Sequence, residues 1–119
     1  MPQHQEFIEK VKKIYKSLGS VTWPGLNGER VFFMDDGFRH LIKKNRKFRK
    51  FKDIYRRLRI VKYCKEIIES SRSYKDYKIV IGRMVTFKYW SLEGKVRELK
   101  IAMIIRQINN GRKHFFSVF

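Results

Sequence analysis

Apolar positions alternate with polar ones along the last third of the chain. Residues 77–90 are rich in the β-branched and aromatic side chains that suit a half-buried pleated surface. In residues 95–108 the apolar side chains of Leu99, Ile101, Met103 and Ile105 recur at every second position, which is the period of a strand. Residues 112–119 are again mostly aromatic and apolar. The pattern predicts three consecutive strands.

Two short segments predict the turns between these strands. Ser91–Gly94 and Asn109–Gly111 contain Gly and Asn, which tolerate the positive φ of tight hairpins. The resulting antiparallel meander has one apolar face, while Ala102, Ile104 and Arg106 make the other face mixed. Residues 31–34 are short and apolar and form a candidate extra strand.

The first two thirds of the chain show helical spacing instead. Residues 3–18 form an amphipathic pattern, ended by Gly19, and a turn-rich connector follows at residues 23–28. Helical spacing resumes at residues 38–45, after Asp35 and Asp36, which we interpret as N-terminal caps rather than as a metal-binding pair. A longer amphipathic pattern then runs from Phe48 to residues 70–71.

These elements predict an α+β fold in which N-terminal helices pack on a C-terminal antiparallel β-meander of three to four strands. The length of 119 residues fits one domain, 1–119. Within it we expect an N-terminal helix in residues 1–20, basic helices in residues 37–70 and the antiparallel sheet in residues 77–119.

The charge of the chain is its strongest global signal. Lys and Arg number 29 against 11 Asp and Glu, which gives a formal net charge of +18. Such an excess repels itself within a compact fold, so a polyanionic partner explains it most simply. Nucleic acid is the leading partner, and an anionic membrane surface or an acidic protein is the alternative.

Other compositional features narrow the class of protein. The single cysteine, Cys64, falls in a helical pattern and is interpreted as a buried structural thiol rather than a nucleophile or redox group. No apolar run approaches the roughly 20 residues of a membrane span, and the first residues lack a signal-peptide pattern. We therefore expect action in a reducing cytoplasm, with the delivery route undetermined.

Basic residues concentrate on the two central helical patterns. His40, Lys43, Lys44 and Lys47 have the spacing of one helical face. The longer pattern adds further cations, among them Arg46, Arg49, Arg56 and Arg57. A charge run is often only a solvated face, but like charges at helical spacing repel each other, so this face is better explained by a bound polyanion.

The residues favour chemistry without a metal or cofactor. The glycines form no phosphate-binding loop, no Cys and His set has zinc spacing, and the few carboxylates are scattered among basic residues. RNA can be cleaved without a metal when its own 2′-OH attacks the adjacent phosphorus. That reaction needs proton transfer, which His supplies near neutral pH, and cations that stabilise the developing charge.

Three histidines are available for this role. His4 lies near the start of the sequence, where chains often fray, and we discount it. His40 lies on the basic helix, and each of His40 and His114 is either a catalytic or a structural histidine. The strand neighbours of His114, Phe115 and Phe116, are typical of a core.

Three residues of the sheet are candidates for phosphate contacts. Arg106 is either a solvent-facing residue beside a turn or a bidentate phosphate clamp. Ser117 is either a tolerated edge position or a phosphate hydrogen-bond donor, and Thr86 has the same two interpretations, with simple strand propensity favoured.

The order of these parts resembles the barnase/colicin/RelE-like ribonuclease superfamily, in particular its phage-associated and polymorphic-toxin branches. The similarity covers residues 31–119 and is carried by Phe38–Lys44, Tyr55–Leu58 and the final Phe116–Val118. It implies metal-independent endoribonuclease activity, often on tRNA or ribosome-bound mRNA, in a toxin restrained by a partner protein. Positions matching the family's functional ones are His40, Lys44, Arg57, Arg106 and Ser117.

The sequence thus supports two hypotheses. In the first, a ribonuclease uses His40, Lys44, Arg57, Arg106 and Ser117 around the scissile phosphate. The wider RNA contacts would come from Lys43, Arg46, Lys47, Arg49, Arg56, Thr86 and His114. In the second, a non-catalytic nucleic-acid-binding module uses the same basic surface without a histidine. If the protein is a toxin, its inhibitor, an antitoxin or immunity protein, should be acidic.

Overall fold

Helices and strands follow one another along the part of the chain that the computed structural model describes, residues 2–118, with side chains described for residues 5–118. The N-terminal half contains α1 (Pro2–Lys16), β1 (Ser20–Trp23), a 3₁₀ turn (Pro24–Leu26), β2 (Glu29–Phe32), α2 (Asp35–Ile42), β3 (Lys43–Lys44) and β4 (Lys47–Phe48). The C-terminal half contains α3 (Phe51–Ser70), β5 (Asp76–Gly82), β6 (Val85–Val96), β7 (Leu99–Ile108) and β8 (Lys113–Val118).

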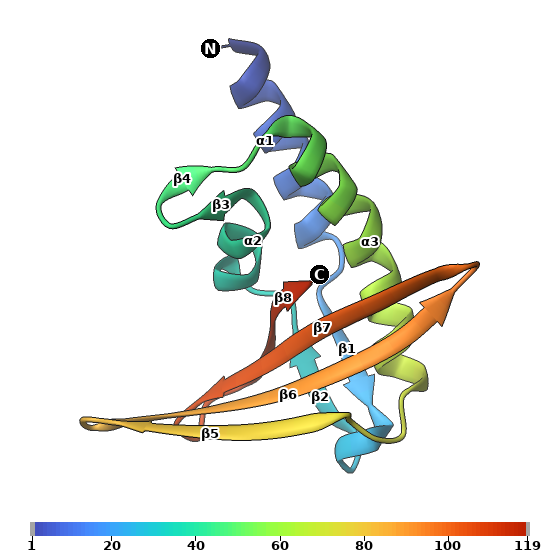
Figure 1. Ribbon diagram of the computed structural model, residues 1–119, viewed down its shortest axis with the longest axis vertical. Helices are drawn as coiled ribbons and strands as arrows, with labels where there is room; N and C mark the ends of the chain where they lie inside the picture. Colours follow the sequence, from blue (N-terminus) through green and yellow to red (C-terminus); the bar gives the residue numbers. More distant parts are fainter. Residues whose placement is uncertain (1, 119) are drawn as a thin grey trace.

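The main sheet has six strands in the order β1-β2-β8-β7-β6-β5 (Figure 1). Every neighbouring pair is antiparallel except β2 and β8, which are parallel. The predicted α+β fold with a C-terminal antiparallel meander is therefore confirmed, and the meander has four strands, β5 to β8. The sheet extends beyond the predicted range, because β2 joins it next to β8 and brings β1 with it.

The meander differs from the prediction in two of its turns. Residues 77–90 do not form one strand, because the chain turns back at residues 83–84. The predicted turn at Ser91–Gly94 is also wrong, since Gly94 lies inside β6, where a Cβ would come within 2.8 Å of the Ile67 side chain of α3. The glycine is needed for close packing of helix on strand. The turn occurs at Arg97 and Glu98, whose φ values are 57° and 100°.

The predicted turn at Asn109–Gly111 is confirmed. Asn109 has a φ of 53°, and the Gly111 N–H donates to the Ile108 carbonyl at 2.9 Å. The side chain of Asn109 also accepts a hydrogen bond from the Thr86 N–H at 2.9 Å. Asn therefore serves both the backbone conformation and the closure of the turn.

The hydrophobic core lies between α3 and one face of the meander. Ile101, Met103 and Ile105 of β7 are fully buried there, whereas the alternate residues Ala102, Ile104 and Arg106 are partly exposed on the other face, as the period of two predicted. Helix α3 contributes Ile54, Leu58, Val61 and Ile68 to this core. We call the face away from α3 the outer face; in Figure 1 it faces the viewer, with β6 and β7 crossing in front of α3.

Other buried residues agree with the helical predictions. Helix α1 buries Val11 and Tyr15, and Gly19 follows it with a φ of 63°. The Cys64 thiol is buried in α3, and burial raises its pKa, which fits a structural thiol. No helix formed by residues 2–118 is long and apolar enough to cross a membrane. The side chain of His4 and the whole of Phe119 lie outside the described residues.

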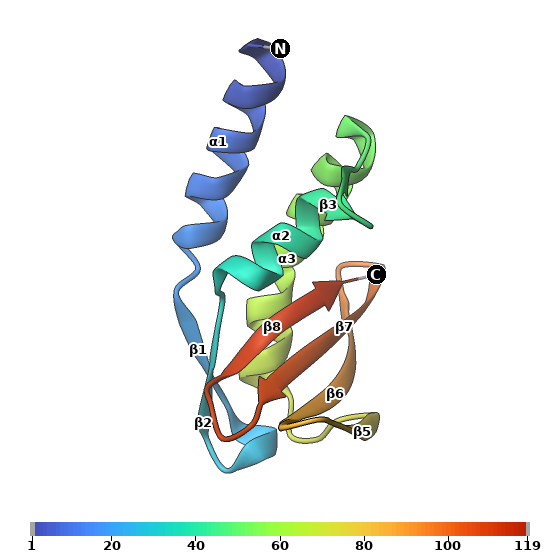
Figure 2. The same cartoon turned by 90° about the vertical axis from the view of Figure 1, so that its left-hand side faces the viewer.

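Helix α2 is held close to β8 by a glycine in its first turn. A Cβ on Gly37 would lie 2.5 Å from the Phe115 carbonyl oxygen and would also meet the Tyr15 hydroxyl. That hydroxyl donates to the Met34 carbonyl at 2.8 Å and so connects α1 to the residue before α2. Figure 2 shows α2 above β8, with α3 behind both. This packing brings His40, in the last turn of α2, next to the end of the sheet.

The basic helix predicted for residues 38–45 ends earlier than expected. Helix α2 stops at Ile42, and Lys43 is already extended, with a φ of −128°. The next residues form a β3–β4 hairpin whose two turn residues, Asn45 and Arg46, have φ values of 52° and 67°. Lys43, Lys44 and Lys47 therefore do not continue the helical face of His40, because the hairpin carries them instead.

Candidate active-site cleft

A cleft of about 690 Å³ opens where α2, the β3–β4 hairpin, α3 and the ends of β7 and β8 meet. Among residues 5–118, its lining includes seven lysine and arginine side chains and a single carboxylate, that of Asp36. The lining residues are Asp36, Arg39, His40, Lys43, Lys44, Asn45, Arg46, Arg49, Arg57, Arg106, Phe116 and Ser117. The excess of positive charge in one concave surface is suited to phosphate groups.

Five of the lining residues are the predicted catalytic candidates, and each comes from a different element. They are His40 of α2, Lys44 of β3, Arg57 of α3, Arg106 of β7 and Ser117 of β8. Helix packing, a hairpin and a strand pairing are all needed to bring them together. Their convergence in one cleft is therefore a property of the fold and not of local sequence.

Arg106 is held in the cleft by three contacts. Its Nε donates to His114 Nε2 at 3.0 Å, and its Nη2 donates to Asp36 Oδ2 at 3.1 Å. The guanidinium carbon also lies 4.2 Å from the centre of the Phe116 ring, in cation–π geometry. Only 12% of the side chain is exposed. These contacts fix the plane of the guanidinium before any ligand binds.

His114 supports Arg106 from β8 and does not line the cleft. Its side chain is buried, and its Nδ1 lies 3.3 Å from the Arg112 carbonyl, so Nδ1 carries the proton while Nε2 accepts from Arg106. Burial lowers the pKa of His114, and the nearby Arg106 charge lowers it further against the opposing Arg112 hydrogen bond. The structure thus places this histidine next to Arg106 and outside the lining of the cleft, where the sequence predicted an RNA contact.

Asp36 has a different role from the predicted cap. The residue before α2 is Met34, with no side-chain capping bond, and Asp36 lies within the first turn. Its carboxylate pairs with Arg106 at 3.1 Å and with Arg39 at 3.6 Å. The capping prediction for Asp36 is therefore wrong. The carboxylate instead orients two cations at the mouth of the cleft.

An aromatic ring brings His40 and Arg106 together. The His40 and Phe116 ring centres are 4.2 Å apart, the same distance that separates Phe116 from the Arg106 guanidinium. The register of β7 and β8 shifts between Ile104 and Ile105, so that Ser117 pairs with Ile104 while Phe116 is left as the extra residue. Such a bulge re-aims side chains. Here it places both Phe116 and Ser117 in the lining of the cleft.

His40 has the properties of a general base. Partial burial lowers the pKa of its imidazole, and the charges of Arg106 and Arg49 lower it further, against a smaller opposing effect of Asp36. The neutral form therefore predominates at pH 7. The side chain is exposed at the cleft. A neutral, accessible imidazole beside fixed cations can accept a proton from a bound hydroxyl.

One carboxylate on α3 positions the arginines of the cleft wall. Asp53 pairs with Arg49 at 3.4 Å, with Arg56 at 3.0 Å and with Arg57 at 3.3 Å. Although burial alone would raise the pKa of Asp53, the hydrogen bonds and charges of these arginines lower it. Arg57 also donates to the Val118 carbonyl, and Arg49 donates to the His40 carbonyl at 3.2 Å.

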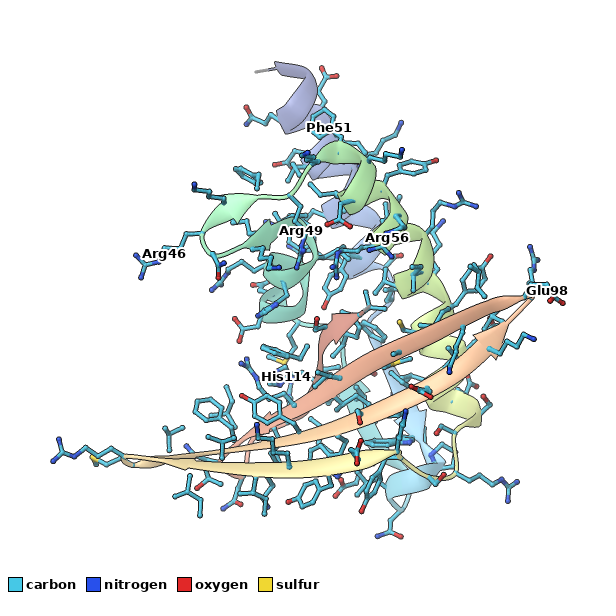
Figure 3. All side chains as sticks on the ribbon, viewed as in Figure 1. Arg46, Arg49, Phe51, Arg56, Glu98 and His114 are labelled. Carbon is cyan, nitrogen blue, oxygen red and sulfur yellow. The ribbon has the colours of Figure 1, made fainter. Side chains whose placement is uncertain are left out.

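The hydrogen bond of Arg57 ties α3 to β8, and that of Arg49, which precedes α3, reaches α2. In Figure 3 Arg49 lies between the hairpin and α3, while Arg46 points outward from the hairpin tip.

Three other predicted contact residues lie outside this lining. Lys47 is exposed on β4, opposite Lys44, and the guanidinium of Arg56 pairs with Asp53 on the surface of α3. Thr86 lies three residues from Tyr89, the strand partner of Arg106, so its side chain projects from the opposite face of the sheet. Lys43, Arg46 and Arg49, by contrast, do line the cleft as expected.

Four lining residues escaped the prediction. Asp36 and Arg39 precede His40 on α2, and the spacing of Asp36 and His40 by four residues was a usable signal that both share a helical face. Asn45 and Phe116 carried no such signal, because their positions depend on the hairpin turn and on the strand bulge.

The cleft is a poor metal site by its donor set. The described side chains contain no group of three or more His, Cys, Asp or Glu residues placed to hold a metal ion. The single carboxylate of the cleft already pairs with two arginines. What the cleft offers is a set of hydrogen-bond donors and one neutral imidazole, which suit an anionic phosphodiester.

Comparisons of the chain with protein-family models, with curated proteins and with solved structures give no significant match.

Proposed function

We propose that this protein is a metal-independent endoribonuclease that cleaves RNA by attack of a 2′-OH on the adjacent phosphorus. One observation carries the proposal: an exposed His40 shares a cleft with Lys44, Arg57, Arg106 and Ser117, which come from separate elements. A surface that only attracts phosphate needs cations but no such base. The superfamily resemblance noted in the sequence supports the same reaction.

The cleft residues divide the chemistry among them. His40 accepts the proton of the 2′-OH, whose oxygen then bonds to phosphorus. Arg106, with its guanidinium plane fixed by His114 and Asp36, stabilises the charge on the pentacoordinate phosphorane. The bond to the 5′-oxygen breaks, and that oxygen leaves with a proton from Lys44 or from water in the open cleft. The products are a 2′,3′-cyclic phosphate and a 5′-OH.

Other cations guide the RNA into the cleft. Lys43, Lys44 and Arg46 of the hairpin extend the positive charge beyond the half-buried Arg49 and Arg57, which both pair with Asp53. Contacts of this kind release condensed counterions, so binding should weaken steeply with salt. They position the backbone without selecting a sequence.

A non-catalytic nucleic-acid-binding module is the second candidate. The seven cations of the cleft favour it, since they account for binding without any chemistry. The two candidates differ in what they require of His40: the module does not need it, and the ribonuclease does.

The resemblance further supports a toxin that acts in the cytoplasm on tRNA or ribosome-bound mRNA. Induction of the chain should then slow cell growth, and His40→Ala should relieve that effect at equal expression. An inhibitory partner would be acidic, to match the net charge of +18. Unimpaired growth during full expression of the active chain would remove the toxin assignment but not the ribonuclease.

The decisive experiment compares binding and cleavage in one pair of variants. His40→Ala should lower cleavage of a labelled RNA in excess EDTA by about 10²- to 10⁴-fold, the usual contribution of a general acid or base. Its affinity for the same RNA with blocked 2′-OH groups should change little. His4→Ala is the matched control and should cleave like the parent chain. Tight, salt-sensitive binding with no cleavage by the parent chain would instead identify the module.

A further inference from the structure

The outer face of the meander presents aromatic rings beside the cleft. Phe87 and Tyr89 of β6 are 6.3 Å apart with ring planes at 22°, and Tyr89 is 5.9 Å from Phe116 of β8. All three are partly exposed. Helix α3 packs on the opposite face, so these rings do not belong to the hydrophobic core (Figure 1). They require another explanation.

A groove of about 410 Å³ includes two of these rings, Tyr89 and Phe116, in its lining. Its lining combines apolar and polar side chains from all four strands of the meander: Asp76, Lys78, Val80, Tyr89, Ser91, Ile104 and Phe116. Phe116 lines both this groove and the cationic cleft. The groove therefore begins where the cleft ends, and a chain bound in the cleft can continue along the outer face.

The strand register orders the charges and the ring across this face. Lys78 pairs with Tyr89, and Tyr89 pairs with Arg106, so a cation, an aromatic ring and a second cation occupy one cross-strand row. Neighbouring strands lie about 4.8 Å apart, which places the outer members of the row about 10 Å apart. A nucleotide in an extended strand likewise carries a phosphate on each side of its sugar while its base branches from that sugar, so the two cations can contact phosphates and the ring between them can contact the base.

We propose that the outer face is a binding site for an unpaired nucleotide, whose base stacks on Tyr89 while its flanking phosphates contact Arg106 and Lys78. The substrate class is then single-stranded RNA, since bases inside a duplex cannot reach a protein ring. Aromatic rings stack on any base, so the site tolerates many sequences. This inference rests on the proposed function, because the phosphate on Arg106 is the scissile one.

The test measures binding of three probes to the intact protein by fluorescence anisotropy. The probes are a labelled single-stranded 2′-O-methyl oligonucleotide, which cannot be cut, an abasic oligonucleotide of equal length and phosphate number, and a duplex of equal length. The single strand should bind about 5- to 100-fold more tightly than the abasic probe, as expected for one stacked base. This comparison uses the unaltered chain and is independent of how any variant folds.

A pair of variants then locates the stacking. Tyr89→Leu should weaken the single strand by about 5- to 100-fold and leave the abasic probe unchanged within about twofold. Tyr77→Leu makes the same change on the other face, where Tyr77 packs against Trp90, and should leave both affinities unchanged. Equal affinity for the single strand and the abasic probe, or no effect of Tyr89→Leu on binding, would overturn the stacking site. The proposed function would still stand if the protein cleaved RNA in EDTA.

Two further outcomes have different meanings. If no probe binds at low salt and no RNA is cut, the proposed function and the stacking site both fail. If sedimentation shows a dimer that Tyr89→Leu dissociates, a second copy of the chain covers the outer face, and the nucleotide site is overturned. A monomer at assay concentration supports the site.

Discussion

Arg106→Lys separates the charge of this residue from its geometry. The substitution keeps a positive charge, but a lysine ammonium cannot hold the planar contacts to His114 at 3.0 Å, to Asp36 at 3.1 Å and to Phe116 at 4.2 Å together. His114 is buried and would lose its partner, which costs about 1–3 kcal/mol of the free energy of unfolding. The folded protein should survive this loss.

Cleavage and binding should respond differently to Arg106→Lys. Loss of one fixed donor to the transition state lowers the single-turnover cleavage rate by about 10²- to 10³-fold. Affinity for a 2′-O-methyl oligonucleotide should fall only a few-fold, with an unchanged salt slope, because the charge remains. Urea unfolding measures the stability of the same samples.

Arg56→Lys is the matched control, since Arg56 is also paired with a carboxylate but lies outside the cleft. It should leave the cleavage rate unchanged. A cleavage rate for Arg106→Lys within about threefold of the parent would refute the reasoning that the guanidinium plane matters. Parallel losses of binding and cleavage would show that Arg106 only binds RNA.

Four other perturbations test separate parts of the structure. Because burial and the Arg106 charge lower the pKa of His40, kcat/KM should be level above pH 7 and fall on acidification with a midpoint below 6.5. A cleavage rate that rises in acid would contradict the general-base role. Arg46→Gly relieves a φ of 67° and should stabilise the hairpin by up to about 1 kcal/mol while lowering the salt slope of RNA binding by about 0.7. The control is Arg97→Gly, which relieves a φ of 57° at the distant β6–β7 turn, next to the Glu98 labelled in Figure 3. It should stabilise the protein without changing RNA binding. Equal effects of the two variants on RNA binding would contradict the assignment of Arg46 to the cleft. Gly37→Ala should lower the free energy of unfolding in urea by about 1–3 kcal/mol, because the new Cβ would lie 2.5 Å from the Phe115 carbonyl oxygen. A stabilising effect would mean that α2 does not pack on β8 as described.

The sequence predicted those features of the fold that depend on local periodicity. Alternation in β7 correctly separated the buried Ile105 from the partly exposed Arg106, and helical spacing identified α1 and α3. It failed where long-range packing decides the outcome. The pattern predicts a turn at Gly94, but the approach of Ile67 requires a glycine inside β6. The parallel pairing of β2 with β8 joins distant segments and leaves no local signal.

The candidate site was predictable as a set of residue types rather than as a geometry. The rarity of histidine singled out His40, and the place of Arg106 on the mixed face of the strand, together with the resemblance, singled out that arginine; both line the cleft. The pairing of Asp36 with Arg106 was missed, because it spans 70 residues and depends on α2 packing against the sheet. The position of Phe116 depends on a bulge in β8, which no periodic pattern reveals.

The most direct test of the central claim is the chemical identity of the RNA ends formed in excess EDTA. The purified chain should cut single-stranded RNA and leave 2′,3′-cyclic phosphate and 5′-OH ends, detected by mass spectrometry. One 2′-deoxy nucleotide at the cleavage position should block the cut there, because His40 would have no hydroxyl to deprotonate. Ends carrying a 5′-phosphate, cleavage through the 2′-deoxy position, or activity that vanishes in EDTA would contradict the account.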